Sequence, residues 1–157
     1  MAGAAAWSED RARAILAGFR GVEGATLPML HALQEEFGCI PEAAVPLVAS
    51  TLNLSRAEVH GIVTFYHDFR RTPPGRHTLK LCRAEACQSR GGDHLAERAQ
   101  ARLGISWGET SADGAVTLEP VFCLGLCAVA PAGMVDGKLV GRLKPERLDE
   151  ILDGAKR

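Results

Sequence analysis

Four of the five cysteines in this 157-residue chain fall into two close pairs, and thiolates at such spacings are common metal ligands. Cys82 and Cys87 are separated by four residues, and Cys123 and Cys127 by three. Three kinds of site are compatible with these pairs: a structural zinc ion held by four thiolates, a [2Fe–2S] cluster held by four thiolates, or inert or redox-active thiols. A redox dithiol usually has the spacing C-x-x-C, which is absent here.

The two intervals favour the cluster over zinc but leave both open. Zinc-binding cysteine pairs are typically separated by about two to four residues, so that C-x3-C fits well and C-x4-C lies at the edge. C-x4-C is also a familiar opening interval of [2Fe–2S] proteins. The segment "CQSRGGDH" contains Cys87 and small residues, and it runs into the start of the next predicted helix. The start of a helix favours a negatively charged group such as a cluster.

The second pair lies in "VFCLGLCAVAP", residues 121–131, which contains no charged residue. Gly125 allows this loop to wrap closely around sulfur. We expect the apolar side chains of the segment to keep water from a cluster, which has more need of such a jacket than structural zinc. These side chains are Val121, Phe122, Leu124, Leu126 and Val129.

Alternating strands and helices are expected around these cysteines. The expected elements are a strand at 77–82, a helix at 93–103, a strand at 114–121, a hairpin at 132–143 and a helix at 144–155. Asp136-Gly137 is a hairpin turn dipeptide, and Pro145 suits the first turn of the last helix. A helix between two strands predicts a parallel pair, hence a small α/β sheet of thioredoxin-like type. Loops that follow parallel strands meet at one edge, so the two cysteine pairs could converge.

The first seventy residues are predicted to be helical. The expected helices cover residues 7–19, 26–37, 41–53 and 54–69. Thr26 is expected to cap the second helix and Gly38 to end it, while Ser55 and Glu58 form a capping box for the fourth. The stretch "RRTPPGR" at 70–76 interrupts helix and strand alike. We therefore expect an N-terminal helical domain at 1–72 and an α/β domain at 76–157. The acids of the last helix are expected to form a solvated face.

Composition excludes several other classes of protein. The net charge of −1 argues against a general nucleic-acid binder. Residues 40–63 resemble a helix-turn-helix, but residues 26–71 carry three Lys/Arg against five acids, a net −2 that opposes phosphate binding. No apolar run approaches the roughly 20 residues of a membrane span, and the N-terminus lacks the features of a signal peptide. We expect a cytoplasmic protein, in which stable disulfides are uncommon.

The pattern C-x4-C followed by "CLGLCAVAP" resembles the thioredoxin-like [2Fe–2S] ferredoxin subunits of respiratory complex I and their relatives. That family also has an N-terminal helical extension ending in a "TFY"-type helix, here "SRAEVHGIVTFYHDFR". The resemblance runs from about Ile15 to about Leu152. Among the relatives, "EVHGIVTFYHDFR" and "LKLCRAEACQSRGG" look most like the gamma subunit of NAD-dependent, molybdenum-containing formate dehydrogenases. The implied fold is α/β, with an N-terminal helical bundle followed by a thioredoxin-like [2Fe–2S] ferredoxin domain.

The resemblance also implies a function. It assigns the four cluster ligands to Cys82, Cys87, Cys123 and Cys127, and it makes the chain an electron-transfer subunit without bond chemistry of its own. The implied partners are a flavin- and NAD-binding subunit and, in the same complex, a molybdopterin subunit that oxidises formate. Cys39 departs from the family, where an aromatic residue or histidine is usual, so we expect it to be a packed residue and not a fifth ligand. Alternatives are the equivalent subunit of complex I or of an NAD-linked hydrogenase, and a zinc-stabilised assembly adaptor.

Overall fold

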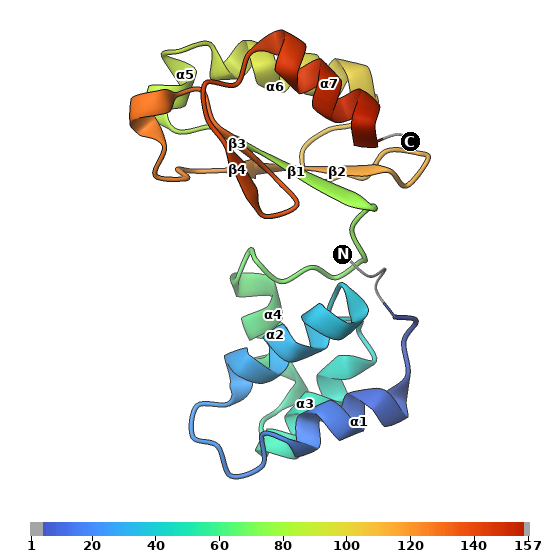
Figure 1. The fold of residues 1–157 in the computed structure, drawn as a ribbon. Helices are drawn as coiled ribbons and strands as arrows, with labels where there is room; N and C mark the ends of the chain where they lie inside the picture. Colours follow the sequence, from blue (N-terminus) through green and yellow to red (C-terminus); the bar gives the residue numbers. More distant parts are fainter. Residues whose placement is uncertain (1–4, 156–157) are drawn as a thin grey trace. The chain divides into compact units, whose positions relative to one another are not determined.

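The computed structural model describes residues 5–155, which divide into two compact units that meet in sequence between Pro73 and Pro74 (Figure 1). The expected domains begin at residue 1 and end at residue 157, so residues 1–4 and 156–157 of those ranges lie outside the described part. Within residues 5–155, no helix is both long enough and apolar enough to cross a membrane.

The first unit consists of four helices around one apolar core. These are α1 (Glu9–Ala17), α2 (Thr26–Phe37), α3 (Ala44–Leu52) and α4 (Arg56–Phe65). Each helix contributes apolar residues at helical spacing, and the largest fully buried ones are Leu16, Met29, Leu30, Leu33, Val48 and Val59. The hydrophobic effect of burying these side chains holds the four short helices together, since helices of about ten residues are marginal alone.

Two of the three predicted helix ends are confirmed. Ser55 accepts a hydrogen bond from the Glu58 backbone N–H, and the Glu58 carboxylate accepts one from the Ser55 backbone N–H. Gly38 ends α2 with a φ of 74°, a left-handed conformation that suits glycine. The predicted cap at Thr26 is wrong. Thr26 is already the first helical residue, and Ala25 before it makes no side-chain cap.

The second unit is a four-stranded sheet with its helices on one side (Figure 1). Its elements are β1 (His77–Cys82), α5 (Glu85–Gln88), α6 (Gly92–Leu103), β2 (Val116–Val121), the 3-10 helix η1 (Cys127–Val129), β3 (Gly133–Val135), β4 (Lys138–Val140) and α7 (Pro145–Ala155). The strand order is β2-β1-β3-β4, with β1 parallel to β2 and antiparallel to β3. The mixed helix and sheet architecture is therefore confirmed.

The hairpin between β3 and β4 turns at Asp136 and Gly137, as the dipeptide predicts. Both residues have positive φ values, 50° and 81°, which is what a type I′ turn requires. The core of this unit lies between the sheet and α6 and α7. It is built from apolar residues of both layers: Leu79, Leu81, Leu95, Ala99, Val116, Leu118, Leu143, Leu148 and Leu152.

Ion pairs join α6 to α7 above this core. Asp149 of α7 accepts a hydrogen bond from the Arg98 guanidinium and pairs with Arg102, each with a nitrogen–oxygen distance of 2.9 Å. These arginines of α6 lower the pKa of Asp149 to about 2, Arg98 having the largest effect. The expected solvated face of α7 is confirmed for Glu146 and Glu150, which are exposed. Asp149 instead reaches across to the neighbouring helix, because α6 presents arginines at successive turns.

The start of α6 packs directly on the backbone of Cys87. A Cβ atom on Gly92 would lie 2.6 Å from the Cys87 carbonyl oxygen, closer than real Cβ contacts allow. Only glycine therefore fits at this point without moving α5 or α6. Gly154, near the end of α7, is the opposite case, since a Cβ there would meet nothing within 4 Å.

These two glycines give a matched test of the contact between α5 and α6. We expect Gly92→Ala to lower the free energy of unfolding by about 1–3 kcal/mol through overpacking. Gly154→Ala should leave it unchanged or raise it by up to about 1 kcal/mol, because alanine favours helix. Urea unfolding followed by circular dichroism measures both. Equal stabilities for the two variants would show that the backbone contact has no energetic role.

The α6–α7 ion pairs predict an acid-dependent loss of stability. The folded-state pKa of Asp149 lies below its ordinary value, so its contribution is present at neutral pH and is lost as the pH falls from about 4 to about 2. We expect Asp149→Asn to unfold at a lower urea concentration than the parent chain at pH 7. Between about pH 4 and about pH 2, it should lose less stability than the parent chain. Asp10→Asn, which changes an exposed acid of the first unit, is the control. An unchanged pH profile in Asp149→Asn would contradict the prediction.

Candidate metal centre

The parallel pairing of β1 with β2 brings the two cysteine pairs to one edge of the sheet. Cys82 is the last residue of β1 and lies opposite Val121, the last residue of β2. Cys87 follows in the short helix α5, and Cys123 and Cys127 follow β2, with Cys127 opening η1. The expected convergence is therefore observed. Cys82 ends β1, as expected from the predicted strand at 77–82.

The sulfur atoms are arranged as two pairs. The Sγ atoms of Cys123 and Cys127 lie 3.7 Å apart, and the thiols of Cys82 and Cys87 contact each other through a hydrogen bond. Two thiolates on one tetrahedral metal, with metal–sulfur bonds of about 2.3 Å, stand about 3.8 Å apart. The distance between the Cys123 and Cys127 sulfur atoms is thus close to that expected for two thiolates on one metal. All four cysteines are free thiols.

The charge of each pair also affects a pKa in the other pair. Cys127 raises the pKa of Cys87 by its charge, and Cys82 acts in the same way on Cys127. Among residues 5–155, no group of three or more His, Cys, Asp or Glu side chains is placed to hold one metal ion. Two thiol pairs side by side would supply the four thiolates that a [2Fe–2S] cluster requires.

Backbone N–H groups point at the sulfur atoms. The sulfur of Cys82 accepts hydrogen bonds from the backbone N–H groups of Ala84, Cys123 and Leu124. Ala132 donates to the sulfur of Cys87, and Gly125 donates to the sulfur of Cys123 over 3.4 Å. Donors of this kind stabilise thiolate charge and tune the potential of a cluster.

These contacts make Cys82 different from its neighbours. Burial raises the pKa of Cys82, but the hydrogen bonds that its sulfur accepts outweigh burial, and its pKa lies below the ordinary value. Burial raises the pKa of Cys87, and the Cys82 thiol adds to the effect. The hydrogen bond with Cys123 and the Cys123 charge raise the pKa of Cys127. Four thiolates in this space repel one another, and a cationic metal centre would relieve that repulsion.

The loop between the second pair of cysteines has an unusual backbone. Cys123 has a φ of 94°, in the left-handed region that non-glycine residues seldom occupy, and Gly125 follows with a φ of 74°. This fold of the chain turns the Cys123 and Leu124 N–H groups toward Cys82. Strained backbone of this kind concentrates at functional sites, where the surrounding structure maintains it.

The two cysteine pairs differ in exposure, and this corrects the expected apolar jacket. Cys82 and Cys87 are 4% and 2% exposed, with Val121, Leu124 and Leu126 packed against them. Cys123 and Cys127 are exposed. Phe122, expected to shield the site, is 75% exposed. The jacket therefore covers one half of the site, and the other half faces the surface.

Cys39 lies in the first unit, in the turn after α2, and is buried. Burial raises its pKa, as for a packed thiol without a charged partner. The residues that sequence reasoning missed are the backbone donors, above all Ala84 and Ala132. Their side chains carry no polar group, so only the folded backbone reveals their role.

Known proteins resemble this chain in sequence. The family model of thioredoxin-like [2Fe-2S] ferredoxins matches residues 12–156. A subunit of the NADH-quinone oxidoreductase of Pseudomonas aeruginosa is 36% identical over 129 residues, which are 82% of this chain and 78% of the relative. The corresponding protein of Escherichia coli K12 is 33% identical, with the same coverage.

A solved structure of an NAD+-reducing [NiFe]-hydrogenase in the air-oxidized state has a similar fold. The TM-score is 0.73 at 24% identity, over 84% of this chain. The chain spans only 23% of the hydrogenase chain that it matches. The resemblance read from the cysteine motifs is thus confirmed: the chain belongs to the thioredoxin-like [2Fe–2S] ferredoxin family, and a [2Fe–2S] cluster is the cofactor of that family.

Proposed function

We propose that this chain is the [2Fe–2S] electron-transfer subunit of an NAD-linked oxidoreductase, with the cluster bound by Cys82, Cys87, Cys123 and Cys127. The observation that carries the proposal is the convergence of two free thiol pairs at the carboxyl ends of β1 and β2. When bound, the cluster supplies one-electron chemistry. The chain itself makes and breaks no bond of a substrate.

The residues around the thiols have separate tasks in this role. The N–H groups of Ala84, Cys123 and Leu124 stabilise negative charge on Cys82, and Ala132 does the same for Cys87. The burial of Cys82 and Cys87 excludes water from one half of the site. The exposure of the other two cysteines gives a partner close access to the cluster, as electron transfer requires.

The proposed direct partner is a flavin- and NAD-binding subunit. Two named relatives are subunits of NADH-quinone oxidoreductases, and the structural neighbour is part of an NAD+-reducing hydrogenase. Both names link this type of chain to nicotinamide chemistry. The chain has no G-x-G-x-x-G motif, so the nicotinamide site belongs to the partner. A reducing compartment such as the cytoplasm suits a site of four free thiols.

Two candidates remain for the enzyme complex to which this subunit belongs. The segments "EVHGIVTFYHDFR" and "LKLCRAEACQSRGG" support formate dehydrogenase, with a molybdopterin subunit that oxidises formate. The 36% identity to a subunit of NADH-quinone oxidoreductase supports a complex I-like assembly. In both, this chain exchanges electrons with the same kind of partner.

Replacement of the ligands tests the cluster. Anaerobically purified chain should contain about two irons and two sulfides. Cys123→Ser and Cys127→Ser should abolish or shift the electron paramagnetic resonance spectrum of the reduced protein, because each removes a thiolate ligand. Cys39→Ser, in the other unit, should leave the spectrum unchanged. A native spectrum in Cys127→Ser would refute the ligand set, and stoichiometric zinc without iron after reconstitution would favour the adaptor role.

The electron donor is tested in the complete native assembly. Formate should reduce the cluster of the assembly, and it should not reduce the cluster of the isolated chain, because this chain has no catalytic site. The absorbance and paramagnetic resonance spectra report the reduction. An assembly that takes electrons from hydrogen, or delivers them to quinone without responding to formate, would refute the formate assignment and leave the electron-transfer role in place.

A further inference from the structure

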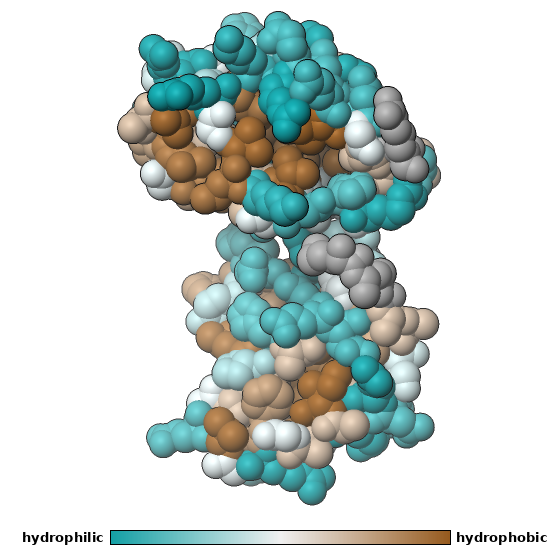
Figure 2. Space-filling model, viewed as in Figure 1, coloured by the Kyte–Doolittle hydropathy of each residue, from teal (hydrophilic) through white to brown (hydrophobic). Residues whose placement is uncertain are grey.

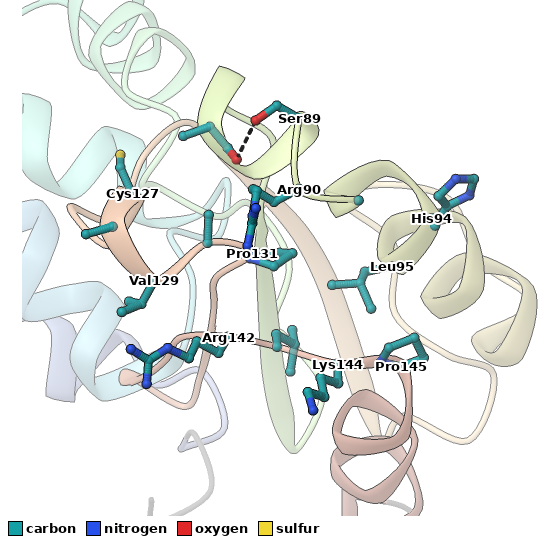
Figure 3. A pocket seen from close by; sticks show the side chains of 15 residues that line it. Ser89, Arg90, His94, Leu95, Cys127, Val129, Pro131, Arg142, Lys144 and Pro145 are labelled. Atoms are coloured by element: carbon teal, nitrogen blue, oxygen red, sulfur yellow. Dashed lines mark hydrogen bonds between the residues drawn. The ribbon is translucent and has the colours of Figure 1, made fainter.

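A cavity of about 910 Å³ opens at the exposed side of the thiol site and has Cys127 in its lining. Three segments that are distant in sequence form its walls: the end of α5 with the start of α6, η1 with the residues after it, and the connection from β4 to α7. Figure 3 shows Arg90 on one side of the cavity and Arg142 and Lys144 on the opposite side, with Val129 and Pro131 between them.

The lining of the cavity is basic. It contains Arg90, His94, Arg142 and Lys144, and none of the described residues that line it is Asp or Glu. Within residues 5–155, no carboxylate pairs with Arg90, Arg142 or Lys144.

The pairing of other basic side chains in this unit makes the contrast clear. Arg83 pairs with Asp93, Arg102 with Asp149 and Arg147 with Glu150. Unpaired positive charge is therefore concentrated beside the exposed half of the thiol site.

The wall that carries Arg142 and Lys144 is fixed to the cysteine loop. The Arg142 backbone N–H donates to the Val129 carbonyl over 2.6 Å, and the Leu143 N–H donates to the Pro131 carbonyl over 2.9 Å. A Cβ on Gly141 would lie 2.6 Å from a Val129 methyl group, so the two segments are in tight contact. The backbone that carries Arg142 and Lys144 is consequently held close to the loop that contains Cys127.

Apolar residues form much of the remaining lining of the cavity. Leu95, Val129, Pro131 and Leu143 line it together with the basic residues. Figure 2 shows an apolar area on this face of the second unit, below the hydrophilic surface of α6 and α7. Exposed cations around apolar surface are typical of the rim of a protein interface, where complementary charge sets orientation and association rate.

We propose that this cavity receives a carboxylate-bearing, otherwise apolar segment of the flavin- and NAD-binding partner, and so docks that partner beside Cys127. The inference rests on the proposed function and adds the surface and the chemistry of recognition. The unpaired cations select an acidic segment, and the apolar lining supplies contact area. Because Cys127 lines the same cavity, a partner docked there lies close to the cluster.

Charge reversal tests the docking in the reconstituted complex. We expect Lys144→Glu and Arg90→Glu to slow association of the cluster-loaded chain with its partner by about tenfold or more at low salt, and to reduce its dependence on ionic strength. Lys138→Glu is the matched control, because Lys138 is an exposed cation on β4 that does not line the cavity. The control should associate within about twofold of the parent chain, as expected for a charge away from the contact.

The outcomes separate this inference from the proposed function. Equal association of Lys144→Glu and Lys138→Glu, with native paramagnetic resonance spectra in both, would refute the docking site alone. Absence of a cluster, or of any NAD-binding partner in the native assembly, would refute the proposed function and this inference with it. Inorganic pyrophosphate is then titrated into the cluster-loaded chain. Binding that depends on Lys144, with association unaffected, would assign the cavity to a small phosphate ligand and also refute the docking.

Discussion

The register of β1 against β2 is the constraint on which the site depends. Because the strands are parallel and Cys82 lies opposite Val121, the chain that leaves each strand must turn at the same edge of the sheet. A shift by one residue would direct the Cys82 side chain to the opposite face of the sheet. The apolar core between the sheet and the helices α6 and α7 fixes that register, and it thereby fixes the thiol pairs that lie outside it.

Electrostatics then decides what these pairs can hold. Burial, and then the Cys82 thiol, raises the pKa of Cys87, and the neighbouring Cys123 raises the pKa of Cys127. The backbone stabilises thiolate charge with N–H groups from three separate segments, around Ala84, Cys123 and Ala132. A cation would offset the charge of four thiolates here, in agreement with a family that carries a [2Fe–2S] cluster.

The alternation of apolar residues and the turn residues are sufficient to predict the strands, the helices α6 and α7 and the meeting of the cysteine pairs, but not the short helix α5. Asp136-Gly137 and the Ser55–Glu58 box are predicted correctly because each depends on residues close in sequence. The Thr26 cap is not, because a helix that starts without a polar cap leaves no signal. The exposure of Phe122 and the cavity at Arg90 and Lys144 depend on contacts between distant segments, which no local pattern records.

The unequal burial of the thiols also affects their reactivity in the metal-free chain. Reaction of a cysteine with oxidants or electrophiles requires both a thiolate and access from solvent. Here the two requirements fall on different residues: Cys82 has the lowered pKa but is buried, and Cys127 is exposed but has a raised pKa. In the metal-free chain, a lowered pKa and access from solvent are thus separated between Cys82 and Cys127.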